Sequence, residues 1–334
     1  MSVAKRLRYR TAFRHLALWA SLLAAAGGTG LSHAASAYPT KPVRILIPFA
    51  PGGGSDLVAR LLAPRLTERL GQPVVIDNRP AAAGVLATEL AAKAAPDGHT
   101  LLVAMTTQAA FPALYSQLSF DAVKSFEPVT LVATSPLVAV VNSSSPATSL
   151  PSFIAYARAN PGKINFGSSG TGSPIHLAGE LLRSMAQIDM VHVVYKGIAP
   201  AITALMGNEI QILFPAVFLA RPHVNNGRLR VLGVTSAKRS GLVPDWPTIA
   251  ESGMPGYDSS IWFGVMAPAK TDRAIIARLH KEIVAILQQP EVRQSFNAQG
   301  TDVVGSTPEQ FAEVLNTDVE RLGKLIRDRG IRLD

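Results

Sequence analysis

The sequence predicts an α/β protein of two lobes, and three observations carry that prediction. Short apolar runs typical of strands alternate along the chain with patterns typical of amphipathic helices, which favours parallel sheets joined by βαβ crossovers. Two strand-to-helix junctions, at 45–60 and 164–182, are rich in glycine and serine. The chain that follows an N-terminal leader is long enough for about two domains.

Residues 1–37 predict a signal peptide. Five basic residues and no acid precede a short apolar stretch, and Ala35-Ser36-Ala37 then offers an A-x-A cleavage site. The apolar stretch is too short and too rich in small residues for a good membrane span, although an uncleaved anchor is the alternative. We therefore expect export to the periplasm, with cleavage after Ala37 or Ala34.

Charge and composition exclude several classes of protein. The formal net charge of the whole chain is +9, and removal of the leader with its five basic residues reduces it to about +4. Lys and Arg form no stripe and aromatic residues are sparse, so the sequence does not predict a nucleic-acid surface. The chain has no cysteine, which excludes disulfides and a lipoprotein anchor. After the leader no apolar stretch is long enough to span a bilayer, so a soluble protein is expected.

The elements follow in order along the chain. Nine apolar runs predict strands at 43–50, 72–78, 100–105, 136–142, 163–167, 191–195, 209–214, 228–235 and 262–268. Helical patterns lie near 57–70, 85–94, 151–159, 174–186, 198–207 and 272–288, with a final pair near 308–329. In the first helix Pro64 should produce a kink or an early end. Ligands of such sheets bind beyond the carboxyl ends of the strands, where both glycine-rich junctions fall.

The run Ser143-Ser144-Ser145-Pro146 breaks the pattern and marks a lobe boundary. If the chain crosses there and returns near 259–268, the first lobe is discontinuous. The predicted lobes are 38–141 plus 262–334 for lobe 1, and 142–261 for lobe 2.

The first junction has the composition of an anion-binding loop. Pro48 and Pro51 stiffen it, the glycines allow close backbone approach, and Ser55 or Asp56 can cap the following helix. Capping is the favoured role for Asp56, because its charge repels an acidic ligand. The candidate ligand-binding residues of this junction are Phe49, Ala50, Gly52, Gly53, Gly54 and Asp56.

The second junction adds hydroxyl groups. Pro174 suits a first helical turn with Ser173 as its cap, and a carboxylate placed there gains donors and the helix dipole. A structural turn is the alternative, and His176 is either a neutral donor to the ligand or a packed residue. The candidates here are Ser168, Ser169, Gly170, Thr171, Ser173 and His176. If the two junctions face each other across a cleft, they clamp a small anion.

Motifs spread over nearly the whole chain after the leader carry a resemblance to a known family. They include YPTKPVRILIPFAPGGGSDLVAR, GQPVVIDNRP, PDGHTLL, LYSQLSFD, GSSGTGSPIHLAGE, VVYKGIAPAITALMGNEI, GRLRVLGVT, DWPTIAESGMPGY and WFGVMAPA. In these motifs the chain resembles the Bug (TctC-like) periplasmic substrate-binding proteins of tripartite tricarboxylate transporters.

That resemblance implies a type II periplasmic-binding-protein fold, with two lobes around a ligand cleft. It further implies no catalysis, no cofactor, capture of a small mono- or dicarboxylate, and membrane transporter subunits as partners; we expect a monomer. Tyr195, Lys196 and Gly197 match the family's ligand-facing turn, where Lys196 could pair with a second carboxylate. Ala81, Ala82 and Ala83 replace a glycine-rich stretch of the family, which predicts a narrower pocket mouth.

Two other functions stay open from the sequence. A serine hydrolase of small esters would use Ser169 or Ser173 with His176. A histidine only three positions from a serine on one helix is, however, poorly placed to act as its base. A ligand-sensing subunit of a signalling system would bind the same acid. No pair of histidines has metal-ligand spacing, so no metal site is predicted.

Overall fold

The computed structural model describes residues 38–80, 84–298 and 300–333. The chain divides into two compact units, Met1–Thr40 and Lys41–Asp334, and all helices and strands below belong to the second. The predicted signal peptide, 1–37, and the loop Ala81, Ala82 and Ala83 lie outside the described residues.

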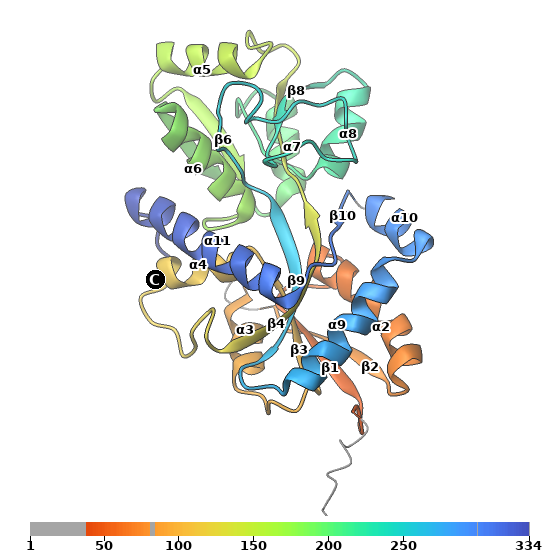
Figure 1. Cartoon of the computed structure of the whole chain (residues 1–334). Helices are drawn as coiled ribbons and strands as arrows, with labels where there is room; N and C mark the ends of the chain where they lie inside the picture. Colours follow the sequence, from red (N-terminus) through yellow and green to blue (C-terminus); the bar gives the residue numbers. More distant parts are fainter. Residues whose placement is uncertain (1–37, 81–83, 299, 334) are drawn as a thin grey trace, which may run out of the picture. The chain divides into compact units, whose positions relative to one another are not determined.

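Six strands of the second unit form a mixed sheet in the order β10-β4-β9-β3-β1-β2 (Figure 1). The strands are β1 Val43–Ile47, β2 Val74–Asn78, β3 Thr100–Met105, β4 Phe126–Ser135, β9 Ile261–Pro268 and β10 Asp302–Val303. β1 pairs in parallel with β2 and β3, whereas β9 runs antiparallel to β3 and β4, and β10 antiparallel to β4. The prediction of a parallel sheet is therefore right for three of these strands only.

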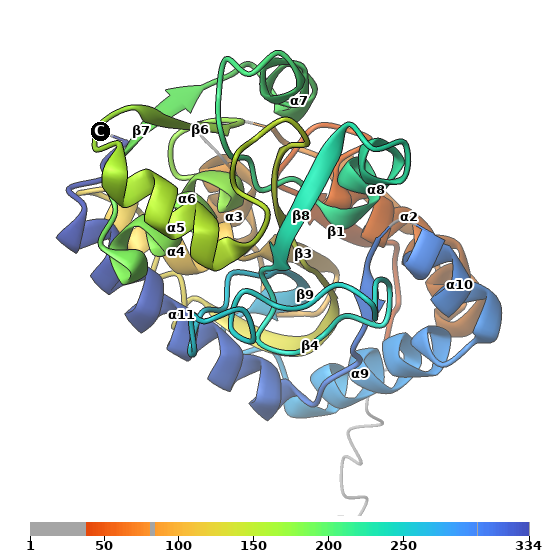
Figure 2. The same cartoon turned by 90° about the horizontal axis from the view of Figure 1, so that it is seen from above.

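Helices cover both faces of this sheet, which explains why Ile45, Leu46 and Ile47 are all buried although successive strand residues point to opposite faces. One group comprises α2 Gly54–Leu70, α9 Arg273–Leu287 and α10 Pro290–Ala298; the other comprises α3 Val85–Ala92, α4 Thr107–Leu114 and α11 Pro308–Asp328. The two views in Figures 1 and 2 agree on this grouping. An ion pair of 2.6 Å between Arg69 and Glu282 joins α2 to α9.

The remaining strands build a second sheet region. β5 Val138–Asn142 pairs antiparallel with β8 Leu229–Val234, and β6 Ile164–Ser168 pairs in parallel with β7 Met190–Val194. Single bridges from Ile212 to Phe166 and from Leu213 to Val140 connect the two pairs. The strand predicted at 209–214 is therefore present as isolated bridges rather than as a regular strand.

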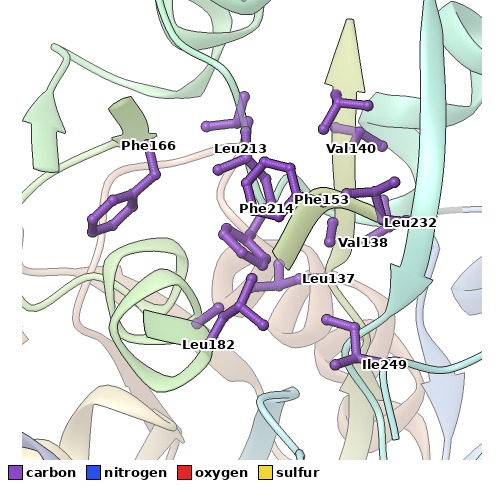
Figure 3. Packing of buried hydrophobic residues seen from close by; sticks show 14 of the residues in the cluster. Leu137, Val138, Val140, Phe153, Phe166, Leu182, Leu213, Phe214, Leu232 and Ile249 are labelled. Atoms are coloured by element: carbon purple, nitrogen blue, oxygen red, sulfur yellow. The ribbon is translucent and has the colours of Figure 1, made fainter. Parts of the chain in front are cut away.

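Four helices pack with this second region: α5 Leu150–Ala159, α6 Pro174–Ala186, α7 Ile198–Met206 and α8 Val217–Asn225. Their apolar faces and the strands share one buried cluster, part of which is drawn in Figure 3. A separate cluster lies between the large sheet and α3, α4 and α11. The large sheet and the second sheet region therefore pack around separate hydrophobic cores.

Several sequence predictions were wrong in detail. Of the two expectations for Pro64, an early end of the helix is wrong: α2 continues through Pro64 to Leu70, and the hydroxyl of Thr67 donates to the carbonyl of Ala63 next to the proline. The final pair of helices is one helix, α11, which begins at a capping box of Thr307 and Gln310 and keeps one buried face over its whole length. β4, β10, α4, α8 and α10 were not predicted.

The chain leaves the large sheet after Ser135 in β4 and returns to it at Ile261 in β9. Between these points it builds the second sheet region. The lobe boundaries at 141/142 and 261/262 stay a prediction.

Candidate functional site

A cavity of ≈ 490 Å³ lies where both glycine-rich junctions meet the ends of β1, β3 and β6. Seven of the predicted ligand residues line it: Phe49, Gly53, Gly54, Ser169, Gly170, Thr171 and Ser173. The other eight do not: Ala50, Gly52, Asp56, Ser168, His176, Tyr195, Lys196 and Gly197. A wider hollow of ≈ 880 Å³, near the starts of α9 and α11, contains none of the predicted residues.

The start of α2 presents hydrogen-bond donors to this cavity. Its N-cap is Gly53, which has no side chain to bond the first N–H groups. Within the described chain the N–H groups of Gly54, Ser55 and Asp56 have no acceptor. The side chain of Ser55 lines the cavity, is 1% exposed, and its Oγ also has no partner among the described residues. Free donors at a helix N-terminus attract an anion.

Asp56 braces the loop before α2. Its Oδ2 accepts from the N–H of Gly52 at 2.8 Å and from Arg60 at 2.7 Å, while Oδ1 accepts from Asn78 at 3.0 Å. Although burial opposes ionisation, these hydrogen bonds hold the pKa of Asp56 below its usual value. Gly52 has a φ of 85°, a conformation that favours glycine. Asp56 therefore has a structural role, but the predicted cap by Ser55 or Asp56 is wrong, because the N-cap is Gly53 and no side chain caps α2.

The loop from Ser168 to Ser173 uses its own polar groups to hold its shape. Ser173 caps α6 by accepting from the N–H of His176, as predicted. The N–H of Gly170 donates to Ser168 Oγ, that of Gly172 donates to His176 Nδ1, and that of Ser173 donates to the carbonyl of Gly170. Three of the loop's backbone donors are therefore already paired.

Gly172 lies close to two leucines of the cavity wall. Its φ is 75°, and a Cβ there would lie 3.0 Å from Leu114 Cδ1 and 3.3 Å from Leu333 Cδ1. Leu333, which follows α11, is fixed at this place by a hydrogen bond of 3.0 Å from its N–H to the carbonyl of Leu114. Both leucines line the cavity.

Two stacked histidines lie beneath the second loop. The rings of His176 and His192 are 3.9 Å apart, and His192 Nε2 lies 2.6 Å from Ser168 Oγ. His176 is 3% exposed and does not reach the cavity, which does not favour the predicted role of a donor to the ligand.

Burial, with smaller effects of His192 and Arg183, lowers the pKa of His176 to about 3. The ring is therefore neutral at physiological pH, and its 3.8 Å contact with Glu180 is not an ion pair. The carboxylate of Glu180 instead accepts from Arg183 at 3.2 Å and from Arg329 at 2.8 Å. This network connects α6 to the segment after α11.

The low pKa of His176 predicts a loss of stability in acid. The folded state keeps the ring neutral, whereas the unfolded chain takes up a proton below a pH of about 6.5, so the stabilisation is present above that pH and falls as the pH decreases towards 3. We expect His176→Gln to remove about 2 kcal/mol of the decrease in unfolding free energy between pH 7 and pH 5. Urea unfolding of both proteins at several pH values measures it; equal pH slopes would contradict the assignment.

No serine and histidine are arranged as a nucleophile and base at the cavity, among the residues that the structure describes. His176 Nδ1 accepts from Gly172, and only its backbone N–H meets Ser173 Oγ. Ser168 does pair with His192, but Ser168 is 0% exposed and does not line the cavity.

The third predicted segment lies outside the cavity wall. The N–H of Tyr195 donates to the carbonyl of Ser168 at 2.9 Å, next to the second loop. The side chain of Lys196 is exposed, and burial raises the pKa of Tyr195.

Sequence reasoning missed much of the cavity wall. The additional lining residues are Ser55, Met105, Thr107, Phe111, Leu114, Gly172, Pro174, Ile175, Ile261 and Leu333. Ser55, Gly172, Pro174 and Ile175 stand inside the two junctions and were treated there as caps, turn or helix residues. The other six come from β3, α4, β9 and the segment after α11, which no local pattern connects to the junctions.

In the described part of the chain, no helix combines the length and apolar character that crossing a membrane requires. Nor do three or more His, Cys, Asp or Glu side chains gather there in a way that could hold a metal ion.

Comparison with known proteins identifies the family. Residues 58–331 match the model of the tripartite tricarboxylate transporter family receptor. Protein BugT of Bordetella pertussis is 37% identical over 313 residues, which cover 92% of this chain and 95% of BugT.

Solved structures of similar proteins lead to the same family. Rpa4515 of R. palustris, solved with adipate, is 34% identical with a TM-score of 0.76, and the match covers 89% of this chain and 100% of that one. The periplasmic binding protein BugD is 30% identical with a TM-score of 0.73 and the same coverage. The α/β two-lobed fold expected from the sequence is the fold of these binding proteins, and the matched proteins are receptors rather than enzymes. The chain belongs to the tripartite tricarboxylate transporter family of receptors, the Bug or TctC proteins.

Proposed function

We propose that this protein is a periplasmic solute-binding protein that captures a small carboxylate in the ≈ 490 Å³ cavity. It acts as a monomer, performs no chemical step, and delivers its ligand to the membrane subunits of a transporter. Residues 1–37 direct export and are removed. Binding closes lobe 1, 38–141 plus 262–334, on lobe 2, 142–261, because each lobe supplies part of the ligand contacts.

The unpartnered hydroxyl of Ser55 at the start of α2 is the observation that carries this proposal. A buried polar group without a partner is costly, and here it stands beside three free backbone N–H groups and the positive end of a 17-residue helix. A carboxylate can accept from several of these donors at once. Sugars and amines would use this set of donors less well, because they lack the negative charge.

Adipate in the structure of the related Rpa4515 supports the carboxylate class, and the family of transporter receptors supports a transporter rather than a sensor as the partner. The contacts that we propose for the ligand are made by Gly53, Gly54 and Ser55 on one side and by Ser169 and Thr171 on the other. Gly170 and Ser173 shape the second loop.

Ser55→Ala tests this function with little effect on folding. Because the buried hydroxyl has no partner in the described chain, its removal should leave the unfolding free energy unchanged or raise it. Affinity for a carboxylate should fall about 10- to 100-fold, the value of a hydrogen bond to a charged group.

The ligand is first found with a thermal-shift panel of carboxylates, sugars and amines, and its affinity is then measured by titration calorimetry. Ser295→Ala, in which an exposed hydroxyl of α10 is removed, serves as the control. Stabilisation by sugars or amines alone, or equal carboxylate affinity in Ser55→Ala and wild type, would refute the proposal.

A further inference from the structure

We infer that the ligand has one anionic end and an apolar body, as in an aliphatic or aromatic monocarboxylate. The inference rests on the proposed function and narrows its ligand class. Free donors gather at the two loops of the cavity, and the described lining contains no charged residue.

The anionic end lies at the start of α2. Gly54, Ser55 and Asp56 have free N–H groups there, and Ser55 adds a hydroxyl that is 1% exposed and has no partner in the described chain. The negative charge of the ligand then meets the positive end of the helix dipole.

The second loop uses several of its donors to hold its own shape. The N–H groups of Gly170, Gly172 and Ser173 are used within the loop and its helix, and the hydroxyl of Ser173 accepts from His176. The start of α6 also has a proline, Pro174, which has no N–H. In the described chain Ser169 and Thr171 keep free N–H and hydroxyl groups, which can join those at the start of α2 on the same carboxylate.

None of the described residues that line the cavity is charged. Lys196, the sequence candidate for a second carboxylate, is exposed and lies outside the wall. A second carboxylate in the cavity would have to give up its hydration without a counter-charge, which is costly.

Apolar side chains form another part of the cavity wall, together with the polar Thr107: Met105, Phe111, Leu114, Ile261 and Leu333. Leu114 is 2% exposed and belongs to the core under α4, and Leu333 packs against that core. Leu333 completes it from the far end of the chain, held by its backbone bond to Leu114. An apolar ligand body gains free energy by covering such a wall.

Titration calorimetry of the wild-type protein with butyrate, pentanoate, hexanoate, benzoate, adipate and malate tests the inference. Affinity should rise about 3- to 4-fold per methylene from butyrate to hexanoate. Adipate, which equals hexanoate with a carboxylate at the other end, should bind at least about 10-fold more weakly than hexanoate because that carboxylate meets the apolar wall.

Two variants test the contacts of the apolar body and of the anionic end separately. Leu333→Ala should weaken hexanoate about 3- to 10-fold more than butyrate, because it removes only part of the apolar wall. Ser55→Ala should weaken both acids by the same factor, and Leu86→Ala, on the exposed face of α3, is the matched leucine control.

Adipate or malate binding more tightly than hexanoate would overturn the inference and leave the proposed function intact. An equal effect of Leu333→Ala on butyrate and hexanoate would also overturn it. If none of the six acids binds, and the wider panel finds no other carboxylate, the proposed function fails as well.

Discussion

Replacing Phe214 by alanine should lower the free energy of unfolding by about 3–5 kcal/mol, the range for large-to-small changes of buried aromatic residues. Phe214 is 0% exposed and ends the segment that bridges β5 and β6. It belongs to the buried cluster of the second sheet region, together with Leu137, Phe153 and Leu213 (Figure 3). Removing the ring leaves a cavity at the point where the segment between the two strand pairs packs into this cluster.

Chemical denaturation with two probes measures this effect. The matched control is Val194→Ala, because Val194 is 55% exposed and should change the unfolding free energy by no more than about 0.5 kcal/mol. A loss below about 1 kcal/mol for Phe214→Ala would mean that the second region repacks around the missing ring.

Asp318→Ala should cost about 2–4 kcal/mol of unfolding free energy. Asp318 is 7% exposed on α11, where it accepts from Trp262 Nε1 at 2.7 Å and from Arg321 at 2.7 Å. Its loss leaves the indole N–H of Trp262 buried without an acceptor and the guanidinium of Arg321 without its carboxylate. The estimate stays below that for a fully buried pair because the side chain of Arg321 is 29% exposed.

Two further variants test whether the hydrogen bond to Trp262 causes this loss of stability. Asp318→Asn keeps an acceptor for Trp262 and should lose about half as much stability. The double variant Asp318→Ala with Trp262→Phe no longer has the unpaired indole donor. Its loss of unfolding free energy should therefore be smaller than the sum of the losses in the two single variants. Strict additivity in urea unfolding would show that the hydrogen bond contributes nothing measurable.

Regular elements were predictable where the local pattern agrees with the tertiary structure. The strand at 100–105 and the helix at 174–186 have the predicted bounds, because alternation, caps and apolar faces there all point to one structure. β4 was missed because Pro128 and Glu127 interrupt its pattern. The proline has no N–H for the ladder, and the register of β4 against β9 shifts next to it.

The candidate site was predictable only in its loops. Glycine, serine and the start of a helix are local signals, and they located Gly53, Gly54 and the second loop. Which donors are free is not local, since it depends on His176 reaching back to Gly172 and on Ser55 finding no acceptor. Leu333 could not be found at all, because only the packing of α11 brings the end of the chain to the cavity.

The neighbouring places of β4 and β9 in the large sheet also determine the order in which this protein can fold. Ser135 and Ile261 are register partners, so the whole segment between them is an insertion whose ends meet. β9 lies between β3 and β4, and neither pairing can form until the ribosome has produced that insertion and the strand after it. Closing so long a loop costs entropy that increases only slowly with its length, but the search for the correct pairing is slow. The newly made chain must therefore keep the edges of β3 and β4 from pairing elsewhere until β9 arrives.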